Sequence, residues 1–181
     1  MSMWTLVSWV LLAHLPPDGA AQLEKVDRLM PELRRLASEP ALVREVKRQN
    51  AQRVPLDSIQ KLDEEWRATP SLTPFKRKVL GSESARSLSR YRDRMGRVVA
   101  EAFVMDNQGA LVGATRRTSD YWQGDEPKWR RSFNGGRGAE LREKPFFDES
   151  TQSYVVQVSL PVKDGARVIG ALTVSISLLE L

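Results

Sequence analysis

AFVMDNQGALVG, residues 102–113, holds two short apolar runs on either side of the turn sequence Asp106-Asn107-Gln108-Gly109. Extended runs joined by a short loop of turn-forming residues predict a β-hairpin. We expect its strands over Val98–Asp106 and Ala110–Thr115, paired antiparallel. The period of the apolar residues is two here, whereas it is helical in the preceding part of the chain.

Three further strands are predicted after the hairpin, over Glu140–Phe147, Ser153–Lys163 and Arg167–Ser177. The last one is apolar with few breaks, which is typical of a central strand covered on both faces. Polar residues alternate with apolar ones along several strands, namely Glu101, Gln157, Ser159, Thr173 and Ser175. One face of the sheet is therefore polar, and it either faces solvent or forms the floor of a pocket.

Before the hairpin, apolar residues recur at steps of three and four, as in Leu23, Val26, Leu29, Leu33 and Leu36. This spacing predicts amphipathic helices. Helices followed by five antiparallel strands indicate an α+β fold. We expect residues 22–95 to form a helical segment and residues 96–181 the sheet domain, the two together making one folding unit.

The N-terminus, Met1–Ala21, contains an apolar run of the length found in secretory signals, followed by Gly19-Ala20-Ala21 as small residues for cleavage. We expect a signal peptide or N-terminal anchor, and a periplasmic or otherwise extracytoplasmic location. The segment lacks Lys and Arg before Lys25, which is atypical of a signal. An uncleaved anchor, the only membrane contact we expect, and an apolar helix packed on the domain remain alternatives.

The amino-acid composition excludes several kinds of binding and catalysis. The formal charge is +5, but basic residues are scattered among acids, so we expect no nucleic-acid partner. The chain has no Cys, and its single His, His14, lies in the predicted leader. Thiol nucleophiles, thiolate metal sites and His-based triads are therefore excluded from the mature domain. We predict a non-enzyme without metal or cofactor.

Aromatic rings, carboxylates, an amide and a turn glycine converge in TSDYWQGDEPKW, residues 118–129. Ligand sites combine apolar rings with a few orienting polar groups, so we predict that this segment is a small-molecule recognition lid. Three alternatives stay open. The rings can plug the core, Asp125 can cap a following helix over Lys128–Phe133, and Trp129 and Phe133 can share one buried helix face.

With this order of elements the chain resembles the extracytoplasmic Cache sensor domains of the PAS-like, single-module kind. The hairpin, the aromatic insertion and the pair Val158-Ser159-Leu160-Pro161-Val162 and Val168-Ile169-Gly170-Ala171-Leu172 carry the resemblance. It implies a five-stranded antiparallel sheet in the order 2-1-5-4-3. It also implies a small-ligand pocket between the sheet and the segment after strand two.

The resemblance places Tyr121, Trp122, Asp125 and Trp129 in the lid. It implies that Asp120 or Asp125 meets a ligand ammonium beside Trp122 or Trp129, and that Arg116 or Arg117 meets a ligand carboxylate. The candidate ligand-binding residues are Tyr121, Trp122, Asp125, Trp129, Arg116, Asp120 and Phe133.

We therefore expect an exported, non-catalytic sensor domain that binds a small polar metabolite, such as an amino acid, amine or carboxylate. No kinase, cyclase or chemotaxis module is present in the sequence, so we expect it to act through a separate membrane receptor or kinase. One alternative is an envelope protein-interaction module that binds no ligand. Another is a carboxylate enzyme or Ca²⁺ site built from Asp120, Asp125 and Glu126, although no EF-hand-like spacing supports it.

Overall fold

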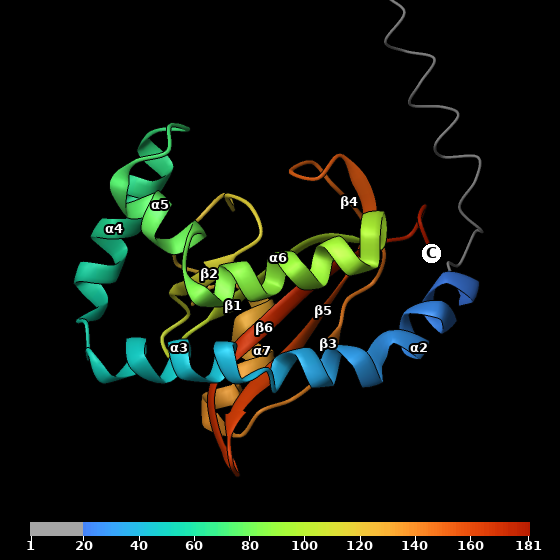
Figure 1. Cartoon of the computed structure of the whole chain (residues 1–181), viewed down its shortest axis with the longest axis horizontal. Helices are drawn as coiled ribbons and strands as arrows, with labels where there is room; N and C mark the ends of the chain where they lie inside the picture. The colour runs from blue at the N-terminus through green and yellow to red at the C-terminus, as the bar shows by residue number, and fades with distance from the viewer. Residues whose placement is uncertain (1–19) are drawn as a thin grey trace, which may run out of the picture.

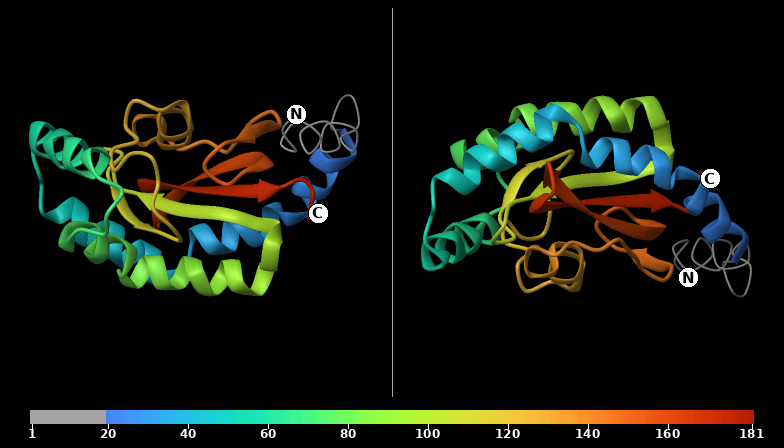
Figure 2. Two further views of the ribbon diagram at one scale, coloured as in Figure 1. Left: turned by 90° about the horizontal axis from the view of Figure 1, so that it is seen from above. Right: turned by 90° about the horizontal axis from the view of Figure 1, so that it is seen from below.

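The computed structural model describes residues 20–181, which form one antiparallel sheet with helices on both faces (Figures 1 and 2). The predicted leader lies outside these residues except for Ala20 and Ala21, and His14 lies outside them too. Within residues 20–181, none of the helices is long and apolar enough to cross a membrane.

The helices that precede the sheet follow the predicted apolar stripes. They are α2 (Ala20–Ala37), α3 (Pro40–Ala51), α4 (Leu56–Ala68), α5 (Pro74–Leu80), α6 (Glu83–Met95) and the 3-10 turn η1 (Gly96–Val98). Side chains cap two of them: Thr73 accepts a hydrogen bond from the Lys76 amide at α5, and Ser82 accepts one from the Ala85 amide at α6. Such caps satisfy amide groups that have no partner within the helix.

The strands are β1 (Val99–Met105), β2 (Leu111–Ala114), β3 (Leu141–Arg142), β4 (Phe146–Asp148), β5 (Ser153–Asp164) and β6 (Arg167–Ser177), with α7 (Pro127–Phe133) and the turn η2 (Asn134–Gly136) inserted after β2. Their order is β2-β1-β6-β5-β3, all pairs being antiparallel, and β4 also pairs with β5. β6 and β5 are the predicted fifth and fourth strands. The predicted order 2-1-5-4-3 and the α+β fold class are therefore confirmed.

The predicted third strand differs from the observed structure. Instead of one strand over Glu140–Phe147, two short strands, β3 and β4, pair with successive parts of β5. Pro145 lies between them and has no amide hydrogen to donate to the ladder, so continuous pairing stops there.

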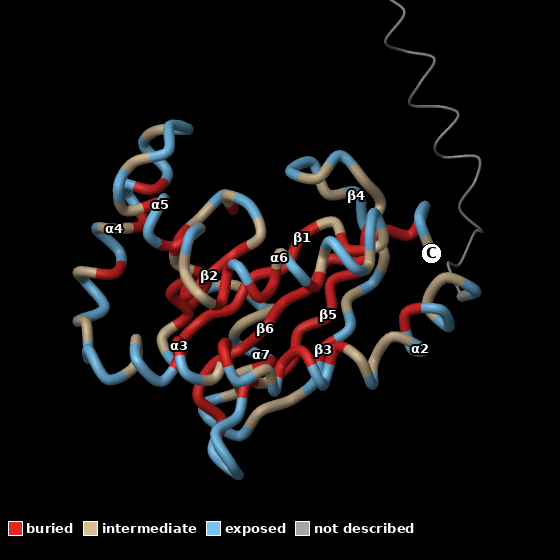
Figure 3. Tube along the Cα trace, viewed as in Figure 1, coloured by how far each residue is buried: buried red, intermediate tan, exposed pale blue. Residues whose placement is uncertain are grey.

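The sheet lies between two unequal layers. Figure 2 shows α2, α3 and α6 along one face, and α7 on the other. A hydrophobic core lies between the first face and its helices. It includes Val104, Val158 and Leu172 from the strands and Leu33 and Leu88 from the helices. In Figure 3 the central strands are buried, whereas the outward sides of the helices are exposed.

The opposite face of the sheet is polar and is nevertheless buried. Glu101, Gln157, Ser159, Thr173 and Ser175 are each at most 8% exposed. Ser159 and Thr173 share a hydrogen bond of 2.9 Å between their hydroxyls, and the Gln157 amide donates to Ser175 at 3.3 Å. The alternative in which this face meets solvent is therefore wrong.

Candidate ligand-binding site

The lid, Thr118–Trp129, is fixed to the helices at its first half. Asp63 of α4 accepts hydrogen bonds from the amides of Tyr121, at 2.7 Å, and Trp122, at 3.0 Å, through one carboxylate oxygen. The Trp66 indole donates to the Thr118 carbonyl at 2.9 Å. These contacts connect the lid to α4, far from it in sequence, and hold its backbone in one path.

Its second half is fixed to the hairpin turn. The Trp122 indole donates to the Gln108 carbonyl at 2.8 Å, and the Trp129 indole donates to the Asp106 carbonyl at 3.0 Å. The approach is so close that a Cβ at Gly109, whose φ is +87°, would collide with Gly124. Both predicted tryptophans thus hold the lid against the turn.

The other candidate residues lie in several places. Phe133 stacks on Trp129, with ring centroids 5.1 Å apart, as the alternative of a shared helix face expected. Tyr121 is buried between Trp66 and Phe75 and lines a cavity beside β2. Neither Trp129 nor Phe133 lines that cavity. The sequence-predicted residues are therefore not gathered around a single space.

The two predicted acids of the lid, Asp120 and Asp125, do not line a common cavity. Asp120 lies 3.7 Å from the Arg67 guanidinium and accepts a hydrogen bond from the Ser119 hydroxyl. Asp125 is exposed, and the residue that precedes α7 as its N-cap is Glu126, without a side-chain capping bond. The alternative role of Asp125 as a helix cap is thus wrong.

A cavity of about 370 Å³, the lid cavity, lies between the polar face of the sheet, the lid and β4. Its walls are Glu101, Phe103, Thr118, Ser119, Gln123, Glu126, Pro127, Lys128, Glu143, Phe146, Asp148, Ser150 and Gln157. β1 and β5 supply the floor, the lid and the start of α7 supply one side, and the β3–β4 region supplies the other. Its position agrees with the pocket that the resemblance implies.

Glu101 is the most deeply buried acid of this cavity. It is 5% exposed, and its Oε1 atom has no hydrogen-bond partner among residues 20–181. Burial raises the pKa of Glu101 to about 7, against the opposing effect of Arg116; Asp148 raises it further and Lys128 lowers it. Buried polar atoms almost always have partners, so an orphaned carboxylate oxygen on a residue that lines a cavity needs an explanation.

The charge of the cavity walls is negative. Glu101, Glu126, Glu143 and Asp148 contribute carboxylates, whereas Lys128 is the only basic residue among the lining residues. The Lys128 ammonium lies 5.6 Å from the centroid of the Phe103 ring. An excess of carboxylates in a partly enclosed space favours a cationic occupant.

Sequence reasoning named Glu101 and Gln157 only as members of the polar face, and it missed Lys128, Glu143 and Asp148 as lining residues. The signal for Glu101 and Gln157 was the alternation on β1 and β5, which placed both on one face. Glu143 and Asp148 could not be found this way, because the break at Pro145 changes how the segment lies against β5.

The residues of the alternative Ca²⁺ site do not converge. Over residues 20–181 no group of three His, Asp or Glu side chains is arranged to hold a metal ion. Asp125 is exposed, and Asp120 is next to Arg67. The metal version of that alternative is therefore contradicted by the positions of its own residues.

Comparison with known proteins shows which solved structures share this architecture. No protein-family model matches the sequence, and the search of curated proteins finds no significant match. The sensor domain of the V. cholerae histidine kinase DctB superposes with a TM-score of 0.51 at 12% identity, over 96% of this chain and 58% of that one. The chain therefore shares the fold of that domain. The expectation drawn from the resemblance to Cache domains is thereby confirmed at the level of the fold.

Two chemoreceptor domains match more loosely. The ligand-binding domain of Campylobacter jejuni Tlp3, in complex with 4-methylisoleucine, gives a TM-score of 0.42 at 13% identity over 87% of this chain and 56% of that one. That of Pseudomonas aeruginosa PctC, in complex with GABA, gives 0.42 at 16% identity over 68% and 53%. This chain spans less than two thirds of the length of each of these three structures.

Proposed function

We propose that this chain is a non-catalytic sensor domain that binds a small metabolite through its ammonium group in the lid cavity. The observation that carries the proposal is Glu101, a buried carboxylate with an unpartnered oxygen at the floor of that cavity. The sensor fold supports the role, and the chemistry of the cavity walls supports the ligand class.

An ammonium group would supply what Glu101 lacks. It brings hydrogen-bond donors for the orphaned oxygen and a positive charge that compensates for its burial. A neutral donor would satisfy this oxygen, but it would not offset the repulsion from Asp148, which raises the pKa of Glu101. A cationic ligand does both.

Neighbouring groups would set the rest of the specificity. Gln157 adds a neutral amide at the floor, and Phe103 and Phe146 add apolar area. Lys128, whose ammonium lies 5.6 Å from the centroid of the Phe103 ring, would repel a second ammonium and could receive a carboxylate. A monoamine or amino acid therefore fits the walls better than a diamine.

We further propose that the domain works outside the cytoplasm and reports to a separate membrane receptor or kinase. The predicted leader supports export, and the sensor fold supports a signalling partner. The candidate residues Tyr121, Trp122, Trp129 and Phe133 would act here by holding the lid in place rather than by touching the ligand.

The test is a thermal-unfolding screen of small amines and amino acids, each beside a neutral analogue such as ethylene glycol for ethanolamine. The protein is first unfolded and refolded by dialysis so that retained ligand is removed. Because a ligand that binds only the folded state stabilises it, amines should raise Tm and their neutral analogues should not.

Glu101→Gln serves as the matched variant, since it keeps the shape and removes the charge. It should keep the fold and lose the response to amines. The proposal would be abandoned if no ammonium compound stabilised the wild-type protein, or if Glu101→Gln responded equally well.

A further inference from the structure

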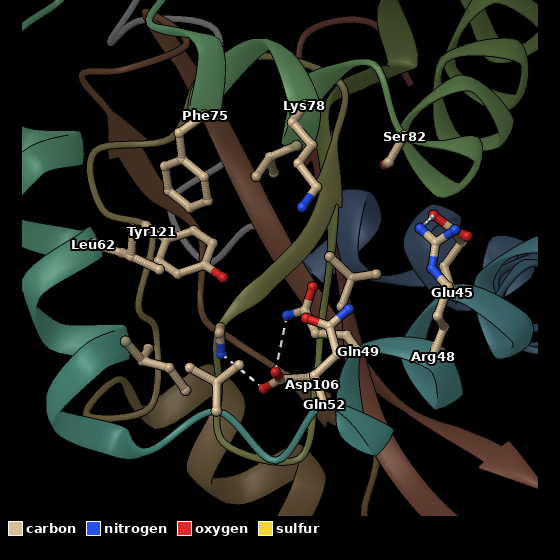
Figure 4. Close-up of a pocket in the computed structure, with 15 residues that line it drawn as sticks. Glu45, Arg48, Gln49, Gln52, Leu62, Phe75, Lys78, Ser82, Asp106 and Tyr121 are labelled. Carbon is tan, nitrogen blue, oxygen red and sulfur yellow. Dashed lines mark hydrogen bonds and ion pairs between the residues drawn. The ribbon is translucent and has the colours of Figure 1, made fainter.

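A second cavity, the edge cavity, lies at the β2 edge of the sheet between α3, α4, α5 and the hairpin (Figure 4). Its volume is about 150 Å³. It shares no lining residue with the lid cavity. Whatever occupies it must therefore be recognised by a different set of side chains.

One half of the edge cavity is apolar. Ile59 and Leu62 of α4 and Phe75 and Val79 of α5 line it. The Phe75 ring meets the Tyr121 ring edge to face, with centroids 4.9 Å apart, so this wall is well packed. An aliphatic group would be sheltered from water here.

The acids of the other half are already satisfied. Asp106 accepts hydrogen bonds from the Gln49 amide at 2.9 Å and from the backbone amides of Gln108 and Ala110 at 2.8 and 3.0 Å. Glu45 pairs with Arg48 at 2.8 Å. Both carboxylates therefore have partners within the protein, unlike the Oε1 atom of Glu101 in the lid cavity.

Two donors on the cavity walls are a lysine ammonium, on the exposed residue Lys78, and a tyrosine hydroxyl, on the buried residue Tyr121. The Lys78 ammonium and the Tyr121 hydroxyl point into the cavity from different walls (Figure 4), and neither forms a hydrogen bond or ion pair with another residue in the part of the chain that the structure describes. Burial, with a smaller effect of Asp106, raises the pKa of Tyr121, so its hydroxyl keeps its proton and can donate. The free groups of the edge cavity are therefore donors, one of them charged.

We propose that the edge cavity is a second binding site, which takes a small monocarboxylate with a short aliphatic chain. The carboxylate would receive hydrogen bonds from Lys78 and Tyr121, and the chain would lie against Ile59, Leu62 and Phe75. Lys78 and Arg48 balance Glu45 and Asp106 in formal charge, so an added carboxylate meets no net negative field.

The volume limits the length of this ligand. A cavity of roughly 150 Å³ holds a molecule about the size of benzene. Butyrate has a comparable number of heavy atoms, and butyramide has the same shape without the charge. These two compounds are therefore a matched pair of probes.

The experiment measures butyrate and butyramide binding by calorimetry and by NMR shift perturbation on the full chain. Butyrate should bind, perturb Leu62 and Val79, and bind more tightly than butyramide. Lys78→Met and Tyr121→Phe should each weaken butyrate binding about tenfold or more, since each removes a donor to a charged group. Neither variant removes apolar packing, so both should fold as the wild type does.

Lys61→Met is the control for charge, because Lys61 is exposed on α4 and does not line the edge cavity. It should leave butyrate affinity unchanged, as should Glu101→Gln, which changes only the lid cavity. The proposal is overturned if butyrate fails to bind, if butyramide binds equally well, or if Lys78→Met behaves like Lys61→Met.

Discussion

Burial of Glu101 costs the folded chain free energy at alkaline pH. The pKa of Glu101 is about 7 in the folded chain against an ordinary value of 4.5, chiefly because burial disfavours the charged form. Between these values the folded state binds more protons than the unfolded state, so stability falls as pH rises. Residues that reduce stability in this way are often retained for function.

The change Glu101→Gln should therefore stabilise the ligand-free protein above pH 7 by roughly 2–3 kcal/mol and have little effect below pH 4.5. Urea unfolding of both proteins across this pH range measures the difference. A variant that was equally stable at every pH, or less stable at high pH, would show that Glu101 is not buried at a cost.

At the scale of elements, helix α4 holds the lid. Asp63 of α4 accepts both amides at the centre of the lid and pairs with Arg67 at 3.0 Å. The sequence predicted α4 and the lid separately, from periodicity and from the clustering of rings. It could not predict their contact, because a helix pattern shows which residues face inward but not which loop they meet.

Replacing Asp63 with alanine should cost about 2–4 kcal/mol of unfolding free energy, because one buried and one partly buried backbone amide lose their acceptor. Asp63→Asn keeps an acceptor oxygen and should cost less. Hydrogen exchange at Tyr121 and Trp122 should accelerate in Asp63→Ala. Glu64→Ala removes an exposed acid from the same helix, and equal behaviour of the two alanine variants would contradict this role.

For the whole molecule, the fold was predictable and the site only in part. The hairpin and the central position of the last strand follow from the pattern of apolar residues, whereas the full strand order was implied by the resemblance to Cache domains. The polar face follows from the alternation around Glu101 and Gln157. The rings drew attention to the lid, yet Trp122 and Trp129 donate to carbonyls of the hairpin turn. The burial of the cavity-lining side chains and the net charge of the cavity decide which ligand fits. Both depend on contacts between segments far apart in the chain, so the sequence pattern does not show them.

The lid cavity and the edge cavity have different characters, although they lie on one scaffold. The lid cavity has an excess of carboxylates, whereas the unpartnered groups of the edge cavity are donors. The lid contributes to both, with Gln123 on one side and Tyr121 on the other.

The central claim is that Glu101 receives a ligand ammonium, and proton release tests it most directly. The amine that stabilises the protein best is titrated calorimetrically at about pH 6 in buffers of different ionisation enthalpy. Glu101 is mostly protonated there in the free protein, so binding should release close to one proton per ligand, and affinity should rise towards about pH 8. Glu101→Gln should release none. Binding without proton release, or with equal affinity in the variant, would contradict the account.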